Sequence, residues 1–170
     1  MAVLEIVTYP ASILRRPAQP VASPEQADVQ KLIDDMADTM YARQGVGLAA
    51  VQVDSDHRII IYDISDERDK RRFHAVINPE IVAAEGEYLS EKEGCLSLPE
   101  FQTDVKRSAR VEVSGLDRQG RPLTITAEDL EAVVLQHEID HLNGILLLDR
   151  SSRLKRELYK KKARKRRKAS

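Results

Sequence analysis

Apolar residues recur with two different periods along this chain, and the period separates helices from strands. A helix is predicted over residues 24–43, because five apolar residues recur there at helical spacing: Val29, Leu32, Ile33, Met36 and Met40. Ser23 before Pro24, with Gln26 three residues after the serine, is typical of a capped helix start. Residues 7–21 are rich in proline and are expected to be irregular.

The middle of the chain has the β-branched and alternating stretches that are typical of strands. Strands are predicted over residues 58–63, 72–79, 80–90, 110–116 and 122–127. Gly86 is expected to kink the third of them, and the sequence DRQG between the last two predicts the turn of a hairpin. Gly94 and Pro99 mark a segment that is expected to be irregular.

A second helix is predicted close to the C-terminal segment and is expected to end at Asn143-Gly144. Thr126 and Asp129 have the spacing of a helix start. Five residues recur at helical spacing and are expected to share its buried face: Leu130, Val133, Val134, His137 and His141. These elements predict one α+β domain with a polar cluster on its buried helix, and no domain boundary before residue ~150.

Composition narrows the class of protein. The chain has 170 residues, of which 42% are hydrophobic and 32% are charged, as in a globular domain. No apolar run approaches the ~20 residues that span a bilayer, and the first residues lack the pattern of a signal peptide. Cys95 is the only cysteine, so no internal disulfide can form, and a lone thiol indicates a reducing compartment. We therefore expect a cytoplasmic protein without a membrane partner.

The net charge of -1 conceals an acidic body and a basic C-terminal segment. Residues 1–152 carry 16 Lys/Arg and 27 Asp/Glu, whereas residues 153–170 carry 11 Lys/Arg and one acid. One interpretation of this segment is a helix docked by Leu154, Leu158 and Tyr159, with a solvated end. Contact with RNA phosphates is a second interpretation, and a nuclear import signal is a third.

The stretch LQHEIDHLNG, residues 135–144, holds two of the four histidines. His137 and His141 are four positions apart, so both imidazoles project from one helix face and can bind one metal ion. Glu138 can reach a water molecule at such an ion without binding the ion itself. The alternative is a pair of hydrogen-bonded core histidines. Asp140 is expected to have a structural role.

Two further stretches suit a metal site. A catalytic metal site has three protein ligands and one open position, and Cys95 is the candidate third ligand. A thiolate with two imidazoles favours a borderline metal over magnesium or calcium. The alternative for a lone cysteine is a small, buried apolar residue of the core. The stretch GVGLAAVQ, residues 45–52, lets the backbone approach a neighbour closely and ends at Gln52. Its alternative is a tightly packed loop.

The three stretches together resemble the signatures of the peptide deformylases. Those signatures read G-x-G-L-A-A-x-Q, E-G-C-L-S and H-E-x-D-H-L-x-G, and they stand here at residues 45–52, 93–97 and 137–144. All three are complete and in the family's order, within a resemblance that covers residues 3–150. It implies an α+β fold in which antiparallel strands pack around a central helix that carries the HExDH motif, followed by a C-terminal helix.

The resemblance also implies an activity: hydrolytic removal of the N-formyl group from the N-terminal methionine of newly made polypeptides, with release of formate. Cys95, His137 and His141 would bind one divalent metal ion per chain. Fe²⁺ is the ion implied in vivo, and Zn²⁺, Ni²⁺ or Co²⁺ are substitutes in purified protein. N-formylmethionyl peptides and nascent chains would be the substrates. Ribosomal RNA is then the natural target of the basic segment 153–170, whereas nuclear import does not suit the family's compartments.

Roles in catalysis follow from the same motifs. Metal-bound hydroxide would attack the formyl carbon, with Glu138 as general acid/base. Gln52 and the backbone N–H of Leu96 would stabilise the oxyanion. Six residues are expected to line the substrate pocket, with core packing as the alternative for the apolar ones: Gly45, Val46, Gly47, Leu130, Val133 and Val134.

Two positions outside the motifs carry specific expectations. Gln102 stands where many members of the family have an arginine, which removes a charge contact with the peptide backbone. Arg107 is expected to pair with Asp140 and orient the motif helix. The chain is accordingly divided into one catalytic domain, residues 1–152, and a basic C-terminal helix or tail, residues 153–170.

Two other classes of protein are alternatives. An H-E-x-x-H metalloprotease shares the ion and the base, but it needs a long substrate cleft and usually has His or Glu as third ligand. A zinc-stabilised RNA-binding module would use the basic tail and would need a fourth protein ligand. Only His57 and His74 remain among the histidines for that position, although an acid could also fill it.

Overall fold

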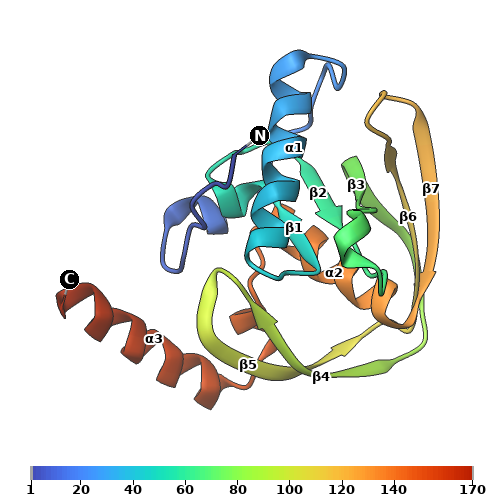
Figure 1. Cartoon of the computed structure of the whole chain (residues 1–170). Coiled ribbons are helices and arrows are strands. Elements are labelled where there is room, and N and C mark those ends of the chain that lie inside the picture. The colour runs from blue at the N-terminus through green and yellow to red at the C-terminus, as the bar shows by residue number, and fades with distance from the viewer. Residues whose placement is uncertain (1, 170) are drawn as a thin grey trace.

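Residues 2–169 are described by this computed structural model, and they form three α-helices and seven strands (Figure 1). The helices are α1 (Ala27–Ala42), α2 (Asp129–Leu142) and α3 (Arg153–Ala169). The strands are β1 (Gly47–Ala49), β2 (Ile59–Tyr62), β3 (His74–Glu85), β4 (Tyr88–Cys95), β5 (Leu98–Arg107), β6 (Arg110–Leu116) and β7 (Pro122–Glu128). Short 3₁₀ segments lie at Ser12–Arg15, Ala50–Val53, Arg68–Lys70 and Leu147–Arg150.

Five strands form an antiparallel sheet in the order β1-β2-β3-β6-β7, and β4 pairs with β5 in a separate two-stranded sheet. Helix α2 packs against the five-stranded sheet and lies between it and the β4–β5 hairpin, which passes below α2 in Figure 1. The expected α+β fold, with antiparallel strands around the motif helix and a C-terminal helix, is confirmed.

The inner strand β2, between β1 and β3, shows why the sheet holds a helix on each face. Successive side chains of a strand point to opposite faces. Ile60 and Tyr62 join the hydrophobic cluster that contains α2, whereas Ile59 and Ile61 join the cluster that contains α1. All four side chains are buried, and each contributes about 1.5–3 kcal/mol relative to exposure. The sheet is therefore a rigid support beneath the motif helix.

Both predicted helix starts are wrong by a few residues. Helix α1 begins at Ala27 rather than at residue 24, and its N-cap residue Gln26 makes no side-chain capping bond. The Gln26 N–H instead donates to the Ser23 carbonyl, within a turn that precedes the helix. Helix α2 begins at Asp129, because Thr126 is still paired in β7. The predicted end of α2 at Asn143-Gly144 is confirmed.

The strands differ from prediction mainly in the middle of the chain. The boundary expected between residues 79 and 80 is wrong, because β3 runs unbroken through it to Glu85. Gly86, expected to kink a strand, lies in the turn before β4, which contains residues 88–90. The segment between Gly94 and Pro99, expected to be irregular, contains the end of β4 and the start of β5. Strand β5 was not predicted, although its side chains alternate between buried and exposed. The predicted hairpin is formed by β6 and β7.

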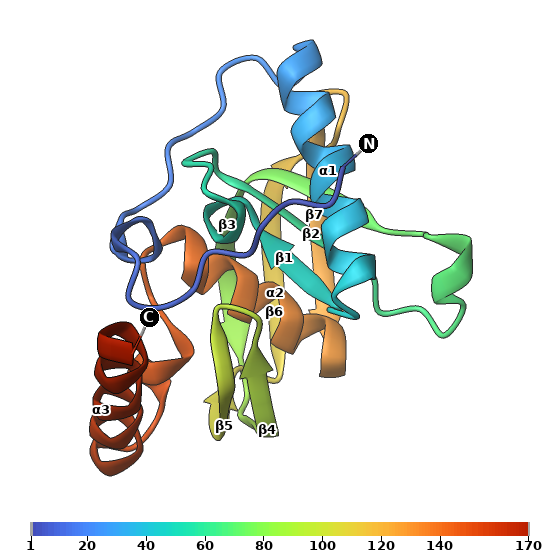
Figure 2. The same cartoon turned by 60° about the vertical axis from the view of Figure 1, so that its left-hand side comes forward.

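Helix α3 lies apart from the five-stranded sheet and on the outer side of the β4–β5 hairpin, as Figure 1 and Figure 2 show. Tyr159 and Ala163 are its buried residues, so docking through Tyr159 is confirmed. Leu154 and Leu158 are 70% and 54% exposed, so their expected part in docking is wrong. The basic segment was defined to residue 170, and Ser170 lies outside the described residues.

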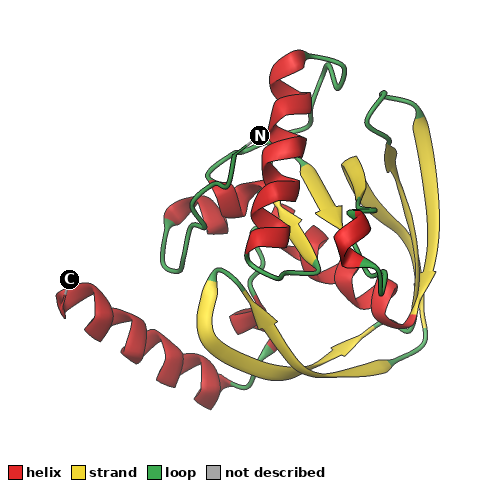
Figure 3. Ribbon diagram, in the orientation of Figure 1, coloured by secondary structure: helices red, strands yellow, loops and turns green. Residues whose placement is uncertain are grey.

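The N-terminal segment has little regular structure, as its prolines predicted (Figure 3). Between residue 2 and α1, a 3₁₀ turn at Ser12–Arg15 and an isolated bridge between Gln19 and His57 interrupt it. The Val7 N–H donates to the Gln52 carbonyl, and the Tyr9 N–H donates to the Ser97 carbonyl. These two hydrogen bonds therefore connect the N-terminal segment to the motifs at residues 45–52 and 93–97. Within residues 2–169, no helix combines the length and apolar character needed to cross a membrane.

Candidate active site

The end of β4 and helix α2 bring three candidate metal ligands to one point. Cys95 is the last residue of β4, and His137 and His141 lie about one turn apart on α2. One ligand atom from each residue lies within 4.8 Å of the other two, and the Cys95 Sγ is 3.3 Å from the His141 Nε2. The two imidazole centroids are 5.2 Å apart. The three side chains that the sequence suggested as ligands thus meet.

Irregular pairing in the β4–β5 hairpin directs Cys95 toward α2. The register shifts between Ser90 and Glu93 and again between Gly94 and Cys95. Lys92, inside the first shift, has φ 52°, in the left-handed region. Such bulges bend a strand and redirect its side chains. The bulged end of β4 therefore directs the Cys95 sulfur toward the two histidines of α2. A regular, flat strand would direct this side chain away from them.

The donor set fits a divalent metal ion. Burial alone would raise the pKa of the Cys95 thiol, but His141 and His137 outweigh it and hold this pKa well below its ordinary value. The thiolate, which is the form that binds metals, is therefore favoured. One sulfur and two imidazole nitrogens suit a borderline metal such as iron, nickel, cobalt or zinc, and leave a fourth position free.

His137 is oriented by a carboxylate from β4 that sequence analysis had not singled out. Glu93 Oε1 lies 2.9 Å from His137 Nδ1, so Nδ1 donates and Nε2 is left to face the site. Burial opposes ionisation of Glu93, but His137 and Arg107 lower its pKa to about 2. The signal was present, because Glu93 precedes Cys95 by two residues and lies inside a motif.

Arg107 on β5 connects the hairpin to the motif helix. Its guanidinium donates twice to Glu93, at 3.0 and 2.7 Å, and once to Asp140 Oδ2, at 2.8 Å. The predicted pairing of Arg107 with Asp140 is confirmed, and so is a structural contact for Asp140. Asp140 also accepts from Arg150, the last residue of the 3₁₀ segment before α3. The Arg107 guanidinium and the carboxylates of Glu93 and Asp140 are largely buried, so this network fixes α2 against β4 and β5.

Glu138 projects from α2 into the site and is 5% exposed. Burial raises the pKa of its carboxyl group, against the opposing effect of His137 and His141. Its Oε2 is buried and has no hydrogen-bond partner among the described residues. A Cβ placed on Gly47 would lie 2.8 Å from Glu138 Oε1, so only glycine allows this approach. The close backbone passage expected for residues 45–52 is confirmed.

Gln52 is held in a fixed orientation beside the sulfur. Its Oε1 accepts the Ala49 N–H at 3.0 Å, and its Nε2 donates to Ser97 Oγ at 3.1 Å. The same Nε2 lies 3.7 Å from the Cys95 Sγ. The amide therefore presents N–H groups toward the site, and Ser97 is a positioning residue that sequence analysis had not assigned.

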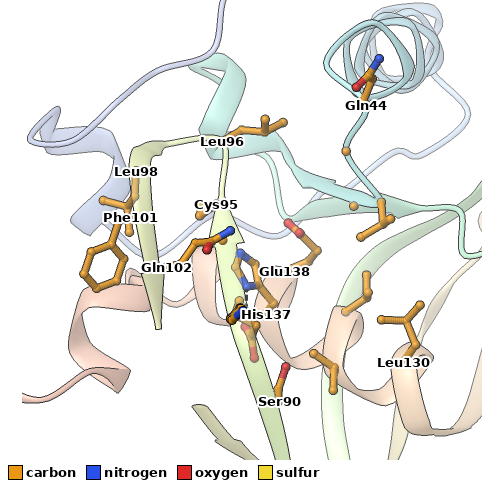
Figure 4. Close-up of a pocket in the computed structure, with 18 of the residues that line it drawn as sticks. Gln44, Ser90, Cys95, Leu96, Leu98, Phe101, Gln102, Leu130, His137 and Glu138 are labelled. Carbon is orange, nitrogen blue, oxygen red and sulfur yellow. Dashed lines mark hydrogen bonds and ion pairs between the residues drawn. The ribbon is translucent and has the colours of Figure 1, made fainter. Parts of the chain in front are cut away.

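A cavity of about 920 Å³ opens over these groups, and Figure 4 shows the side chains that point into it. Every predicted site residue lines it except His141, which is 1% exposed. Val133 and Val134 are buried, as expected of the inward face of α2, but Leu130 is 51% exposed and stands at the rim. Sequence analysis had not assigned Gln44, Glu91 or Phe101 to the site, and their side chains come from segments without a motif.

The described residues do not form the closed site of a zinc-stabilised RNA-binding module. Across residues 2–169, the group of candidate metal ligands contains Cys95 and the two histidines of α2 and no fourth member. His74 stacks against Tyr62 with ring centroids 5.1 Å apart, and His57 lies 4.0 Å from an Asp56 oxygen. Both remaining histidines are thus engaged elsewhere.

Three metal donors that leave one position open lie next to the buried Glu138 carboxylate and the Gln52 amide. This combination of groups is that of a metal-dependent hydrolase. The family model described as polypeptide deformylase matches residues 3–157, and the chain belongs to this family. Its members are metal-dependent enzymes that remove the N-formyl group from newly made polypeptides. The resemblance seen in the sequence is therefore confirmed.

Similar proteins support this family over the whole chain. The peptide deformylase of Desulfosudis oleivorans is 68% identical over 98% of this chain and 95% of its own length. A peptide deformylase structure from Legionella pneumophila has a TM-score of 0.90 and 44% identity, and covers 99% of this chain and 97% of its own. A class I type b peptide deformylase from Acinetobacter baumannii, bound to Met-Ala-Ser, has a TM-score of 0.82 and 35% identity, with 88% and 98% covered.

Proposed function

We propose that this chain hydrolyses the formamide of N-formylmethionyl peptides in the cavity between β4 and α2. The observation that carries the proposal is the meeting of Cys95, His137 and His141 beside the unpaired Glu138 oxygen. The Met-Ala-Ser bound by the Acinetobacter baumannii enzyme has the sequence that deformylation of formyl-Met-Ala-Ser would leave. The cavity suits a peptide of that kind.

We propose Cys95, His137 and His141 as the ligands of one divalent ion per chain, with Fe²⁺ as the ion in the cell. Such an ion, when bound, lowers the pKa of a coordinated water molecule and polarises a carbonyl oxygen. The choice of Fe²⁺ rests on the family, since the same donors also accept Zn²⁺, Ni²⁺ or Co²⁺. Metal analysis of anaerobically purified protein tests it: one iron per chain is expected, and zinc alone would contradict the choice.

Glu138 is proposed as the general acid/base. Its carboxylate takes a proton from the attacking water, while the water oxygen bonds to the formyl carbon. The C–N bond then breaks, and Glu138 returns the proton to the leaving nitrogen, so formate and a free amine result. A raised pKa brings this carboxyl closer to neutrality, which suits a group that must both accept and release a proton.

Gln52 and Leu96 are proposed to stabilise the negative charge that develops on the formyl oxygen. The Gln52 Nε2 carries two hydrogens, and its bond to Ser97 aims this amide at the site. The Leu96 backbone N–H belongs to the turn that follows Cys95. Donors held in place before the reaction stabilise such a charge strongly, because they need not reorganise.

The methionine side chain is proposed to lie among apolar residues at one end of the cavity. Val46, Leu130, Val133 and Val134 line the cavity, and Gly45 and Gly47 keep the adjoining backbone close. Val46 is 43% exposed, so it has contact surface to offer a substrate. Gln102 also lines the cavity, where its uncharged amide cannot form an ion pair with the peptide.

Formate release from formyl-Met-Ala-Ser tests the proposed function. Protein loaded with Fe²⁺ or Ni²⁺ is expected to release formate and leave Met-Ala-Ser intact. Acetyl-Met-Ala-Ser is the matched control, and little acetate is expected. Cleavage of an internal peptide bond would identify a metalloprotease instead. Absence of formate from fully metal-loaded protein would contradict the assignment.

The remaining proposals concern the compartment of the enzyme, its division into domains and its contact with ribosomal RNA. We propose a cytoplasmic enzyme, since Cys95 is a free thiol and the substrates are new chains. We also propose that residues 1–152 form the catalytic domain and that the basic segment 153–170 contacts ribosomal RNA. The support is the exposed, strongly cationic surface of α3.

Co-sedimentation with ribosomes tests the RNA contact. The full chain is expected to pellet with ribosomes at low salt. A variant with Lys161→Gln, Lys165→Gln and Lys168→Gln, all exposed, is expected to pellet less. Equal amounts in both pellets would contradict the contact.

A further inference from the structure

A second, smaller cavity lies next to the active-site cavity, between the start of β5 and helix α3. Its volume is about 170 Å³. Glu100, Phe101 and Gln102 line both cavities, so the two hollows share one wall. Figure 4 shows Phe101 and Gln102 side by side on this wall, with Gln102 nearer to His137. We call the second hollow the β5–α3 groove.

The floor of the β5–α3 groove is apolar and firmly held. Phe101 and Tyr159 meet edge to face, with ring centroids 5.1 Å apart. The Tyr159 hydroxyl donates to the Pro99 carbonyl at 3.3 Å, which fixes α3 against β5. Leu158 lines the groove and remains 54% exposed, although it lies on the most polar helix of the chain. This surface is available to an apolar side chain of a bound molecule.

The wall formed by α3 is cationic. Lys155, Lys162 and Arg166 line it, at spacings of seven and four residues along one face of the helix. Arg166 packs over the Tyr159 ring, 5.5 Å from its centroid. Within residues 2–169, neither Lys155 nor Lys162 forms a side-chain ion pair, whereas Lys160 on a neighbouring face pairs with Glu157. The groove lining holds these three cations and one carboxylate, that of Glu100, so its net charge is positive and suits an anionic group.

We propose that the β5–α3 groove binds the part of the substrate peptide that follows its first few residues, and that it favours acidic side chains alternating with apolar ones. The inference rests on the proposed function. The shared wall connects the two cavities, so a peptide whose N-terminus lies in the active site reaches the groove by continuing along this wall, and each extended residue advances it by about 3.3 Å. An extended chain places alternate side chains on opposite sides, so one set can meet the floor and the other the cations.

Nucleic acid is the competing occupant, and the groove favours peptide. RNA phosphates would use the three cations, but they would not require an apolar floor or a wall shared with the active site. RNA binding is proposed for the outer faces of α3, which carry the other lysines and arginines. The two occupants therefore predict effects at different residues of the same helix.

Three formylated peptides test the inference. Each begins with formyl-Met-Ala-Ser and continues with Asp-Leu-Asp-Leu-Asp, Ser-Leu-Ser-Leu-Ser or Lys-Leu-Lys-Leu-Lys. Release of formate from the unextended tripeptide establishes that the proposed function holds. The acidic extension is expected to raise kcat/KM about threefold to tenfold over the serine extension, as for one or two exposed ion pairs, and the basic extension to lower it. High salt is expected to reduce both differences.

A pair of charge-matched variants locates the effect. In Lys155→Gln/Lys162→Gln the ratio of kcat/KM for the acidic over the serine extension is expected to fall to about one, since exposed ion pairs are lost. Lys161→Gln/Lys165→Gln removes the same charge from exposed positions outside the groove, and this ratio is expected to persist. Leu158→Ser is expected to lower kcat/KM for all three extended peptides relative to the tripeptide.

The outcomes separate the two proposals. If the tripeptide is not deformylated, the proposed function fails. If it is deformylated and all three extensions react equally, only the groove inference fails. If both double lysine variants lose the preference for the acidic extension equally, this preference arises from the overall positive charge of α3. The groove is then not the binding site. If the groove variant changes RNA binding but leaves peptide preference unchanged, RNA is the occupant and the inference is overturned.

Discussion

Helices α2 and α3 differ in how they hold their charged residues. On α2, His137 and Asp140 contact Glu93 and Arg107 of the neighbouring hairpin, and Glu138 is buried. On α3, the lysines and arginines other than Arg156 and Lys160 are exposed, and Tyr159 and Ala163 are buried against the body. Electrostatic interactions are several times stronger in a buried setting than in water. The buried charged groups of α2 are therefore suited to catalysis, whereas the exposed cations of α3 are suited to weak, salt-sensitive binding.

The largest effect is expected from removal of the buried carboxylate of α2. Glu138→Ala should lower kcat by about 10³–10⁴-fold, because no other group would accept and return the proton. Metal content and the unfolding temperature should stay close to those of the parent, since Glu138 is not proposed as a ligand. Formate release and metal analysis on the same sample check both parts. A metal-loaded variant that works at the parent rate would contradict the role of Glu138.

Arg107→Met should give the next largest effect, on stability. The substitution leaves the buried carboxylates of Glu93 and Asp140 without their shared cation, which typically costs about 3–5 kcal/mol. Thermal unfolding followed by circular dichroism measures the loss. Arg110→Met is the matched control, because Arg110 pairs with Glu85 in solvent, and its effect should be much smaller than that of Arg107→Met. Equal losses for the two variants would remove the contrast between buried and exposed pairs.

Gln52→Ala should lower kcat about 10²–10³-fold, as for other lost oxyanion donors. Ser97→Ala, which removes only the group that aims the Gln52 amide, should lower kcat by less. KM for formyl-Met-Ala-Ser should change little in either variant, because the contact forms as charge develops. A large rise in KM with unchanged kcat would show that Gln52 binds the substrate instead.

The smallest effect is expected at the exposed Leu158 of α3, and the buried Tyr159 of the same helix provides the contrast. Leu158→Ala should change the free energy of unfolding by less than about 0.5 kcal/mol, because this side chain is largely exposed. Tyr159→Ala should cost about 2–4 kcal/mol, since it removes the ring that packs against Phe101 and Tyr9. Urea unfolding of the two variants gives the comparison. Equal free energies would mean that α3 is not docked through Tyr159.

The sequence predicted the site better than it predicted the elements that build it. The spacing of His137 and His141 is a property of one helix, so it could be read directly. Cys95 was identified, but the bulged hairpin that turns it toward α2 was not, because bulges arise from pairing between strands. Helix starts were misplaced for a similar reason: Thr126 has a cap-like sequence, but pairing with β6 keeps it in a strand.

The contacts between elements were the least predictable part of the site. Glu93 orients His137, and Ser97 aims Gln52, across sequence separations that carry no periodic signal. The pairing of Arg107 with Asp140, predicted for a residue outside the motifs, is confirmed. Exposure of Leu158 was not predicted, because helical spacing alone does not show whether a partner surface lies opposite. Local periodicity thus revealed ligands, whereas tertiary packing decided their orientation.

X-ray absorption at the metal edge of anaerobically purified protein tests the central claim most directly. The account predicts one ion per chain with one sulfur neighbour at about 2.3 Å and two imidazole nitrogens at about 2.0–2.1 Å, the distances typical of such ligands to zinc. Cys95→Ser should remove the sulfur signal. A metal shell without sulfur in the unmodified protein would contradict the account.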